Sequence, residues 1–334
     1  MDSRITQPAH DGTAHPAGPP FSPLRLGTWP TPLEPAPRLA TALGLRPEDL
    51  WIKRDDLTGL AGGGNKIRKL EWTVAKALAE HGDTLVTTGA AQSNHARLTA
   101  AAGARLGLDV VLVLQGEPPA AAAGNLLLDS LLGARLVWAG DADGEALDAA
   151  ARETAKDLRK AGATPALIPF GGSSALGARG YLDAGSELLE QCPDVQHIVV
   201  ALGSGGTMAG LVAAAGARRV LGVDTGARRD AKAAVHEYAA ALTHAPVAAE
   251  ELRVRTDQIG AGYGTLTPAT AEALSLAARC EGVVLDPVYT GRALAGLRAA
   301  VRDGDIRPGE TTVLVHTGGL PGFFGHSEIP AVLG

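Results

Sequence analysis

The chain has 334 residues, is 46% hydrophobic and 20% charged, and carries a formal net charge of −6. The acidic balance and the lack of a basic block argue against a nucleic-acid or anionic-membrane surface. No apolar run approaches the roughly 18 residues that a membrane-spanning helix needs, and the N-terminus lacks the layout of a signal peptide. Cys192 and Cys280 cannot build a disulfide framework. We therefore expect a cytoplasmic enzyme with a buried core in one or two domains.

The predicted elements alternate along the chain after a predicted mobile tail at residues 1–23, which lack apolar periodicity. In chain order they are helix Ile67–Glu80, strand Thr84–Thr88, helix Asn94–Leu106, strand Val110–Gln115, strand Arg135–Trp138, helix Glu145–Lys160, strand Ala166–Phe170, helix Ala175–Leu189, strand His197–Leu202, helix Thr207–Ala215, strand Arg219–Asp224, helix Arg292–Arg302 and strand Thr312–His316. Near-continuous apolar strands separated by helices indicate an α/β fold, with parallel strands covered on both faces.

A glycine-rich turn opens the helix that follows the strand His197–Leu202. Backbone N–H groups at such a helix start form a cradle for an anion, usually phosphate, whereas the alternative is a tight packing turn. Met208 stands where a dinucleotide-binding fingerprint needs its third glycine. The residues of this predicted cradle are Gly203, Ser204, Gly205, Gly206 and Thr207.

Two other glycine-rich segments miss familiar motifs by one or two residues. Gly62–Lys66 is not a P-loop, because Asn65 replaces the glycine before the lysine and Ile67 replaces the Ser/Thr. Gly171–Ala175 is not a nucleophile elbow, because Ala175 takes the last glycine position.

Lys66 follows three glycines and an asparagine, at the start of a predicted amphipathic helix. The positive end of a helix lowers the pKa of a nearby lysine and favours the neutral amine, as a Schiff-base lysine requires. A solvated surface lysine is the alternative. Lys69 lies three residues on, on nearly the same helix face, where it could meet an anion.

A polar turn, Gln92-Ser-Asn-His95, follows the strand Thr84–Thr88. Ser93 is a natural helix N-cap, but polar side chains and free amides at the carboxyl end of a buried strand also suit a substrate carboxylate. His95 is a candidate ligand or base, with a structural role as the alternative. The nine histidines show no metal-ligand spacing, so we expect no metal.

Lys66, the Ser93-Asn94 turn and the glycine cradle together resemble the tryptophan-synthase-like (fold type II) pyridoxal-phosphate enzymes. More narrowly, five ordered motifs between about Leu24 and Phe324 resemble the D-cysteine desulfhydrase and 1-aminocyclopropane-1-carboxylate (ACC) deaminase family. The motifs are Ile52-Lys-Arg-Asp-Asp-Leu57, Gly63-Gly-Asn-Lys-Ile-Arg-Lys-Leu-Glu71, Gln92-Ser-Asn-His95, Leu285-Asp-Pro-Val-Tyr-Thr290 and His316-Thr-Gly-Gly319. The resemblance implies two open, twisted, mostly parallel sheets with helices on both faces.

The resemblance also implies a role for each matching residue. Lys66 holds pyridoxal 5′-phosphate as a Schiff base and then moves the Cα proton, while Lys69 and the cradle bind the phosphate. Asn94 hydrogen-bonds the phenolic oxygen of the cofactor and, with Ser93 and His95, belongs to the site of a small amino-acid substrate. Tyr289 and Tyr263 are expected beside the ring and the substrate from opposite sides.

Thr290 and Thr317, both expected to contact the cofactor, favour the desulfhydrase pattern. In ACC deaminases a Glu follows the Tyr of Asp-Pro-Val-Tyr, and a Leu stands in His-x-Gly-Gly. A neutral threonine cannot keep the pyridine nitrogen protonated, so the strong electron sink that ring opening needs is missing. β-Elimination needs less delocalisation, because a good leaving group departs once the Cα proton is gone. We predict elimination from D-cysteine, or a related β-substituted amino acid, to pyruvate, ammonia and sulfide.

Other functions stay open at this point: ACC deamination, L-cysteate sulfo-lyase activity, and, more remotely, cofactor binding without catalysis. Family members usually form homodimers, which the resemblance implies here too. It also implies a large cofactor-binding domain of residues 24–65 and 176–334, a small domain of residues 66–175, and a site in the cleft between them.

Overall fold

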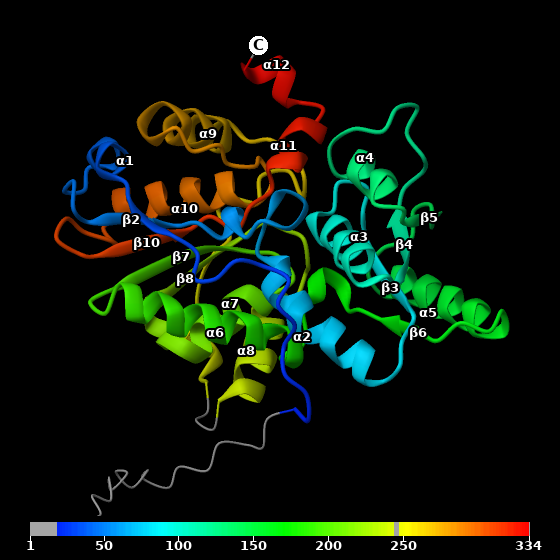
Figure 1. The fold of residues 1–334 in the computed structure, drawn as a ribbon. Coiled ribbons are helices and arrows are strands. Elements are labelled where there is room, and N and C mark those ends of the chain that lie inside the picture. Colours follow the sequence, from blue (N-terminus) through cyan, green and yellow to red (C-terminus); the bar gives the residue numbers. More distant parts are fainter. Residues whose placement is uncertain (1–18, 244–246, 334) are drawn as a thin grey trace, which may run out of the picture.

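The computed structural model describes residues 19–243 and 247–333, so residues 1–18 of the predicted tail lie outside the described residues. Its strands form two separate sheets (Figure 1). The strands are β1 (Leu33–Pro35), β2 (Leu50–Lys53), β3 (Thr84–Ala90), β4 (Asp109–Gln115), β5 (Arg135–Trp138), β6 (Pro165–Leu167), β7 (His197–Leu202), β8 (Val220–Asp224), β9 (Arg253–Arg255) and β10 (Thr312–Val315). The helices are α1 (Pro37–Leu43), α2 (Lys66–Ala79), α3 (Asn94–Leu106), α4 (Gly124–Leu131), α5 (Gly144–Lys160), α6 (Ala175–Gln191), α7 (Gly206–Ala215), α8 (Ala231–Leu242), α9 (Pro268–Glu281), α10 (Thr290–Arg302), α11 (Leu320–Gly325) and α12 (Ile329–Leu333).

The larger sheet has the strand order β1-β2-β10-β7-β8-β9, and all its pairs are parallel except β1 with β2. Helices α6, α7 and α8 cover one face, and α1, α9 and α10 cover the other (Figure 1). Because both faces are covered, β7 reads as a continuous apolar run.

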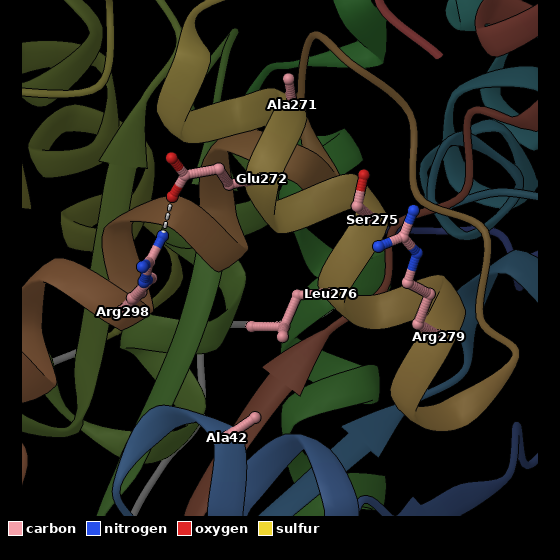
Figure 2. Close-up of a pocket in the computed structure, with 7 residues that line it drawn as sticks. All are labelled: Ala42, Ala271, Glu272, Ser275, Leu276, Arg279 and Arg298. Carbon is pink, nitrogen blue, oxygen red and sulfur yellow. Dashed lines mark hydrogen bonds and ion pairs between the residues drawn. The ribbon is translucent and has the colours of Figure 1, made fainter. Parts of the chain in front are cut away.

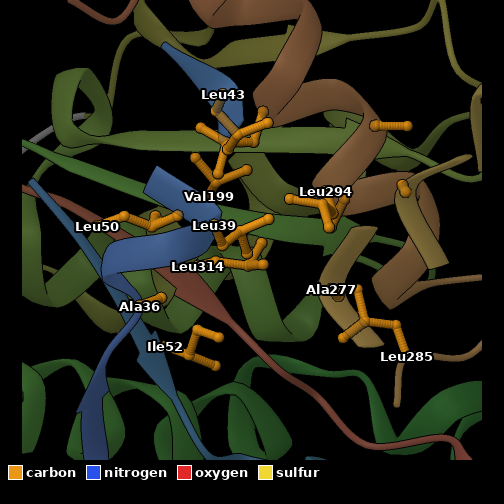
Figure 3. Packing of buried hydrophobic residues seen from close by; sticks show 14 of the residues in the cluster. Ala36, Leu39, Leu43, Leu50, Ile52, Val199, Ala277, Leu285, Leu294 and Leu314 are labelled. Atoms are coloured by element: carbon orange, nitrogen blue, oxygen red, sulfur yellow. The ribbon is translucent and has the colours of Figure 1, made fainter. Parts of the chain in front are cut away.

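A cluster of buried aliphatic side chains joins α1, α9 and α10 to the larger sheet (Figure 3). Leu39 of α1 and Leu294 of α10 are fully buried against Leu50, Val199 and Leu314 of the sheet. Burying each such side chain contributes roughly 1.5–3 kcal/mol. This packing fixes the strand ends from which the glycine cradle emerges.

The smaller sheet has the order β5-β4-β3-β6, with every pair parallel. Helices α2 and α3 pack on one face and α5 packs on the other. The carboxyl ends of β3 and β7 both lead into the polar or glycine-rich turns predicted from the sequence. In open α/β sheets these ends are where ligands bind.

The predicted α/β class with two mostly parallel sheets is confirmed, and each predicted strand and helix corresponds to an observed one. Several boundaries differ by one to three residues, and two of these differences have a clear local cause. The strand predicted at Ala166–Phe170 ends at Leu167, because Pro169 has no N–H to donate and Phe170 begins a 3-10 turn. Helix α10 starts at Thr290 rather than Arg292, because Asp286 accepts the N–H groups of Tyr289 and Thr290.

Several short or Ala-rich elements were not predicted. Strand β2 contains Lys53, a charged residue that is 2% exposed, so its sequence lacks the apolar pattern of the other central strands. Helix α9 begins after Thr267, whose hydroxyl accepts the N–H of Thr270, a cap that has no capping-box partner in sequence. The other unpredicted elements are β1, β9, α1, α4, α8, α11 and α12.

Asp129 on α4 is expected to make stability depend on pH. It is fully buried, and neither carboxyl oxygen has a hydrogen-bond partner within the described residues. Burial raises its pKa from 3.8 to about 7, although nearby Arg97 opposes this. Because the folded pKa is the higher one, stability that is present below about pH 4 is lost as the pH rises towards 7.

The variant Asp129→Asn cannot ionise and should remove this slope. Relative to the unmodified protein it should gain up to roughly 1.4 kcal/mol of stability per pH unit between about pH 4 and 7. Urea unfolding at several pH values, at one fixed cofactor concentration, measures the difference. Parallel stability curves for the two proteins would show that Asp129 keeps its ordinary pKa.

Candidate active site

A cavity of about 800 Å³ lies at the carboxyl ends of β3, β7 and β8. Its size suits a small organic ligand. It brings together residues that are far apart in sequence. Those predicted from the sequence that line it are Lys66, Ser93, Asn94, His95, Gly203, Ser204, Gly205, Thr207, Tyr263, Tyr289 and Thr317. Lys69, Gly206 and Thr290 are not among the lining residues and lie behind the wall.

Lys66 is the first residue of α2, and the glycines before it permit its approach to the cavity. Gly63 has a φ of +70°, and a Cβ there would lie 2.0 Å from the Asp56 carbonyl oxygen. Within the described residues no hydrogen bond is made by Lys66 Nζ. Burial lowers the pKa of Lys66 to about 8, with Asp286 opposing the shift. At neutral pH it is therefore a neutral amine more often than an exposed lysine is.

The glycine cradle is the start of α7, with Gly205 in a left-handed conformation at φ +95°. The N–H of Gly206 donates to Ser173 Oγ over 3.2 Å. A Cβ at Gly206 would lie 2.8 Å from Ser173 Oγ and 3.2 Å from Lys69 Nζ, so only glycine fits. Lys69 Nζ donates to Ser173 Oγ over 2.9 Å, and Ser173 is also hydrogen-bonded to Ser204 Oγ over 2.7 Å.

Lys69 is a buried lysine at a positively polarised helix end. It is 1% exposed, and the salt bridges of the described residues include none to it. Burial, together with Lys66, holds the pKa of Lys69 well below its usual value. A cation and a helix N-terminus pointing at one place, without a carboxylate, suit a bound phosphate. The cradle and the free amine of Lys66 therefore fit pyridoxal phosphate, which needs a phosphate site and a lysine.

The start of α3 offers a second anion site. Ser93 caps the helix, because its Oγ accepts the N–H of Ala96 over 3.1 Å. The N–H groups of Asn94 and His95 have no acceptor within the part of the chain that the structure describes. Free amides at a helix N-terminus suit a carboxylate, as predicted for the substrate.

The His95 side chain is less suited to that role than its backbone. Thr87 Oγ1 donates to the Ile168 carbonyl over 2.9 Å and therefore accepts from His95 Nε2, 2.9 Å away. Burial, with Lys66 and Lys69, holds the pKa of His95 well below its usual value. The ring is then neutral with Nδ1 as an acceptor, and an acceptor does not bind a carboxylate. Its role in substrate binding stays a prediction that rests on the backbone.

Tyr263 and Tyr289 meet in the cavity wall. Their hydroxyls are 2.7 Å apart, and their rings lie edge to face with centroids 6.2 Å apart. Tyr289 also packs against the cradle, since a Cβ at Gly203 would lie 3.1 Å from its ring. Burial raises the pKa of Tyr289 well above its usual value, so its hydroxyl remains a proton donor.

The two predicted threonines are placed differently. Thr317 lines the cavity, and its carbonyl accepts the N–H of Asn65 over 2.9 Å. Thr290 is 1% exposed and does not line it. Its hydroxyl donates to Asp286 Oδ1 over 2.7 Å and accepts the N–H of Asp286 over 2.8 Å. Cofactor contact by Thr290 stays a prediction.

Sequence reasoning missed three residues that organise the site. Ser173 links Lys69 to the cradle, and Asn65 Nδ2 donates to Thr207 Oγ1 over 3.0 Å. Asp286 accepts the N–H of Tyr289 and so fixes the start of α10. Ser173 lies in the glycine-rich stretch Gly171–Ala175, which matches no familiar motif, and the sequence assigns no role to Asn65 or Asp286 within their motifs.

A second hollow of about 520 Å³ lies between α1, α9 and α10 (Figure 2). Its lining contains an ion pair between Arg298 and Glu272, and none of the predicted site residues.

Within the described residues, no group of three or more His, Cys, Asp or Glu side chains is placed to hold a metal ion. None of the helices described is long and apolar enough to cross a membrane.

Residues 24–318 match the family model described as pyridoxal-phosphate dependent enzyme. The chain belongs to this family. Pyridoxal phosphate is therefore its cofactor, in agreement with the fit of Lys66 and the cradle.

Individual relatives that match most of the chain carry two different activity names. The chain is 41% identical over 326 residues to D-cysteine desulfhydrase of Salmonella typhi, covering 92% of this chain and 96% of the relative. It is 40% identical over 321 residues to a Pyrococcus abyssi protein named "Putative 1-aminocyclopropane-1-carboxylate deaminase", covering 92% and 94%. A solved structure of an ACC deaminase homologue superposes with a TM-score of 0.83 at 36% identity, covering 94% of this chain and 97% of the other. The predicted fold type II architecture is confirmed.

Lys69 should contribute strongly to the affinity for pyridoxal phosphate. Replacing it with glutamine removes the buried cation below the cradle, and we expect the dissociation constant of the cofactor to rise by about 30-fold or more. Equilibrium dialysis of the cofactor-free protein measures it. The control Lys76→Gln, on the same helix, removes an exposed lysine paired with Glu80 and should leave the constant unchanged.

The same variant separates binding from folding. Without cofactor, Lys69→Gln should be at least as stable as the unmodified protein, because it no longer buries an uncompensated charge. An unchanged cofactor affinity would place the phosphate elsewhere.

Proposed function

We propose that this protein catalyses β-elimination from D-cysteine, or a related β-substituted amino acid, with pyruvate, ammonia and, from cysteine, sulfide as products. One water is consumed when the released enamine is hydrolysed. Support comes from the similarity to a D-cysteine desulfhydrase over 92% of the chain. The relative named for ACC deamination is about as similar, so the choice between the two depends on the site.

The observation that carries the choice is that the start of α10, behind the cavity lining, leaves no carboxylic acid free to reach the cavity. The Thr290 hydroxyl is bonded to Asp286, and Asp286 accepts the N–H groups of Val288, Tyr289 and Thr290. With its oxygens occupied by these donors, Asp286 offers no acidic proton to the cavity. A thiolate leaves readily from Cβ, whereas opening a cyclopropane ring needs stronger withdrawal of electrons. This arrangement therefore supports elimination.

The residues of the chain divide the work as follows. Bound pyridoxal phosphate supplies the electron sink for the substrate carbon that loses its proton. The amides at the start of α3, with Ser93, bind the substrate carboxylate and orient Cα towards Lys66. Lys66 Nζ, with its lowered pKa, takes up the Cα proton. The linked hydroxyls of Tyr289 and Tyr263 supply a proton donor for the leaving sulfur.

One observation supports elimination of sulfite from L-cysteate as a second candidate. Arg228 and Arg229 both line the cavity. Arg228 is paired with Asp230 and donates to the Tyr238 hydroxyl, but Arg229 is exposed and makes no salt bridge within the described residues. A free cation at the cavity suits a substrate with a second negative group.

The deciding experiment assays pyruvate formation from D-cysteine, L-cysteine, L-cysteate and ACC in parallel. Selective turnover of D-cysteine with sulfide release supports the proposal. Turnover of L-cysteate alone supports the second candidate. Turnover of ACC contradicts the argument from the start of α10, and inertness towards all four contradicts the proposed substrates while leaving the cofactor in place.

We further propose a cytoplasmic homodimer with a small domain of residues 66–175 and a large domain of residues 24–65 and 176–334. The domain division is supported by the smaller sheet, which is built only from strands between Thr84 and Leu167, whereas the dimer and the location rest on the family resemblance alone. Light scattering during size-exclusion chromatography tests the dimer. Limited proteolysis that releases a stable fragment with boundaries near residues 66 and 175 would support the division.

A further inference from the structure

We propose that Arg97 is a positioning residue that fixes the orientation of the Asn94 amide and the loop that carries Lys66. The inference rests on the proposed role of Asn94 beside the cofactor, and not on the identity of the substrate. Arg97 lies on α3, one turn after Asn94, and is fully buried. It is absent from the cavity lining, so it acts through other residues.

The first contacts of Arg97 are with the loop before Lys66. Its Nη1 donates to the carbonyl oxygens of Ala61 and Gly63 over 2.6 and 3.0 Å. Both residues have positive φ, +43° at Ala61 and +70° at Gly63, and such a backbone persists only where its surroundings hold it. Two charge-assisted hydrogen bonds from one guanidinium hold this loop. The base of helix α2 is thereby tied to helix α3.

The second set of contacts is a chain of hydrogen bonds in which each donor and each acceptor can be assigned in one way only. Arg97 Nε donates to Asn125 Oδ1 over 3.0 Å. Because a guanidinium only donates, the amide of Asn125 must present its oxygen to Arg97. Asn125 Nδ2 is then left to donate to the Gln92 carbonyl over 3.0 Å and to Asn94 Oδ1 over 3.1 Å. Arg97 Nη2 lies 3.5 Å from the same Asn94 oxygen.

The consequence concerns the half of the Asn94 amide that faces away from Arg97. With Oδ1 held by two donors, Asn94 Nδ2 is the group left for the cavity, and it has no acceptor within the described residues. An asparagine alone can present either its oxygen or its nitrogen. Arg97 and Asn125 remove that choice. The cavity therefore offers an N–H donor, which suits the phenolic oxygen of the cofactor. If the Asn94 amide rotated by 180°, it would present an acceptor oxygen instead, and this hydrogen bond would be lost.

The test compares two ligands and two variants that keep the charge of the site. Dissociation constants are measured for pyridoxal phosphate and for the analogue with hydrogen in place of the phenolic hydroxyl. The variant Arg97→Lys keeps the positive charge but loses the several N–H donors of the guanidinium. The variant Asn125→Leu keeps Arg97 but removes the amide that connects it to Asn94. Because loss of stability weakens both ligands alike, the ratio of the two constants reports on the contact to the phenolic oxygen.

The preference for pyridoxal phosphate over the analogue should fall by about 10-fold in both variants, the value of one hydrogen bond to a charged group. The matched control Arg68→Lys changes another buried arginine, whose partners are Asp55 and Glu187, and should keep the ratio of the unmodified protein. A ratio unchanged in Arg97→Lys and Asn125→Leu, or lowered equally in Arg68→Lys, would overturn the proposal. If Arg97→Lys does not fold, Asn125→Leu decides between the same outcomes.

This readout also separates the inference from the proposed reaction. The ratio is measured without substrate, so a protein that turns over none of the four amino acids can still show the loss of preference. Conversely, a protein active on D-cysteine whose ratio does not change in the variants would retain its proposed function and exclude the role of Arg97.

Discussion

The variant Lys66→Ala is expected to lose the visible absorbance of the lysine-bound cofactor and to lower kcat/KM by roughly 10³-fold or more. No other lysine lines the cavity within the described residues, so no neighbour can replace the amine. Lys69 is the nearest candidate along the helix, but its Nζ is held by Ser173 and Gly171 beneath the cradle. Pyruvate formation and the absorption spectrum, measured on the same preparation, check both parts.

The control for this change is Lys76→Ala, further along the same helix and exposed to solvent, which should leave spectrum and turnover unchanged. Lys66→Arg keeps the positive charge but offers no amine of lowered pKa, and we expect it to be as inactive as the alanine variant. Turnover by Lys66→Ala near that of the unmodified protein would mean that another group moves the Cα proton.

The variant Arg68→Met is expected to lower the free energy of unfolding by about 3–5 kcal/mol, since it leaves buried carboxylates without their cation. Arg68 binds Asp55 through two hydrogen bonds of 2.9 Å and Glu187 through two of 3.0 Å. Its guanidinium also lies 4.0 Å from the ring centre of Trp29. These contacts join α2 to α6 and to the N-terminal segment.

The same variant should become less sensitive to acid than the unmodified protein. Burial alone would raise the pKa of Asp55, but Arg68 outweighs it, and the pKa lies below its usual value of 3.8. An acid with a lowered pKa adds stability at pH values above that usual value and loses it as the pH falls. Without Arg68 burial prevails and raises the pKa of Asp55 above its usual value, so part of the stability that the variant loses at neutral pH should return as the pH falls.

Chemical unfolding at two pH values measures both effects. The matched control Arg302→Met removes an arginine whose one ion pair among the described residues, with Asp303, is exposed, and it should change stability by no more than about 0.5 kcal/mol. If Arg68→Met were as stable as this control, the buried network would contribute nothing to holding α2.

The apolar strands and most helices of the site could be predicted because their patterns are local. The glycines before Lys66 and the Ser93 cap are local signals too. Strand β2 escaped prediction since Lys53 is buried in an ion pair with Glu187, a partner 134 positions away. Likewise Ser173 meets Lys69 only after the chain has passed through the smaller sheet. A single sequence carries no signal for such pairs, whose energy depends on the completed fold.

Three helices, α2, α3 and α7, begin at the wall of one cavity, and two buried lysines accompany them. Within the described residues Lys69 makes no salt bridge beside the phosphate cradle, although four carboxylates, those of Asp143, Glu145, Asp148 and Asp230, line the same cavity. A bound phosphate supplies the negative charge that Lys69 does not find in the described part of the protein. Inorganic phosphate should therefore compete with the cofactor for this cradle, and raising its concentration should weaken cofactor binding.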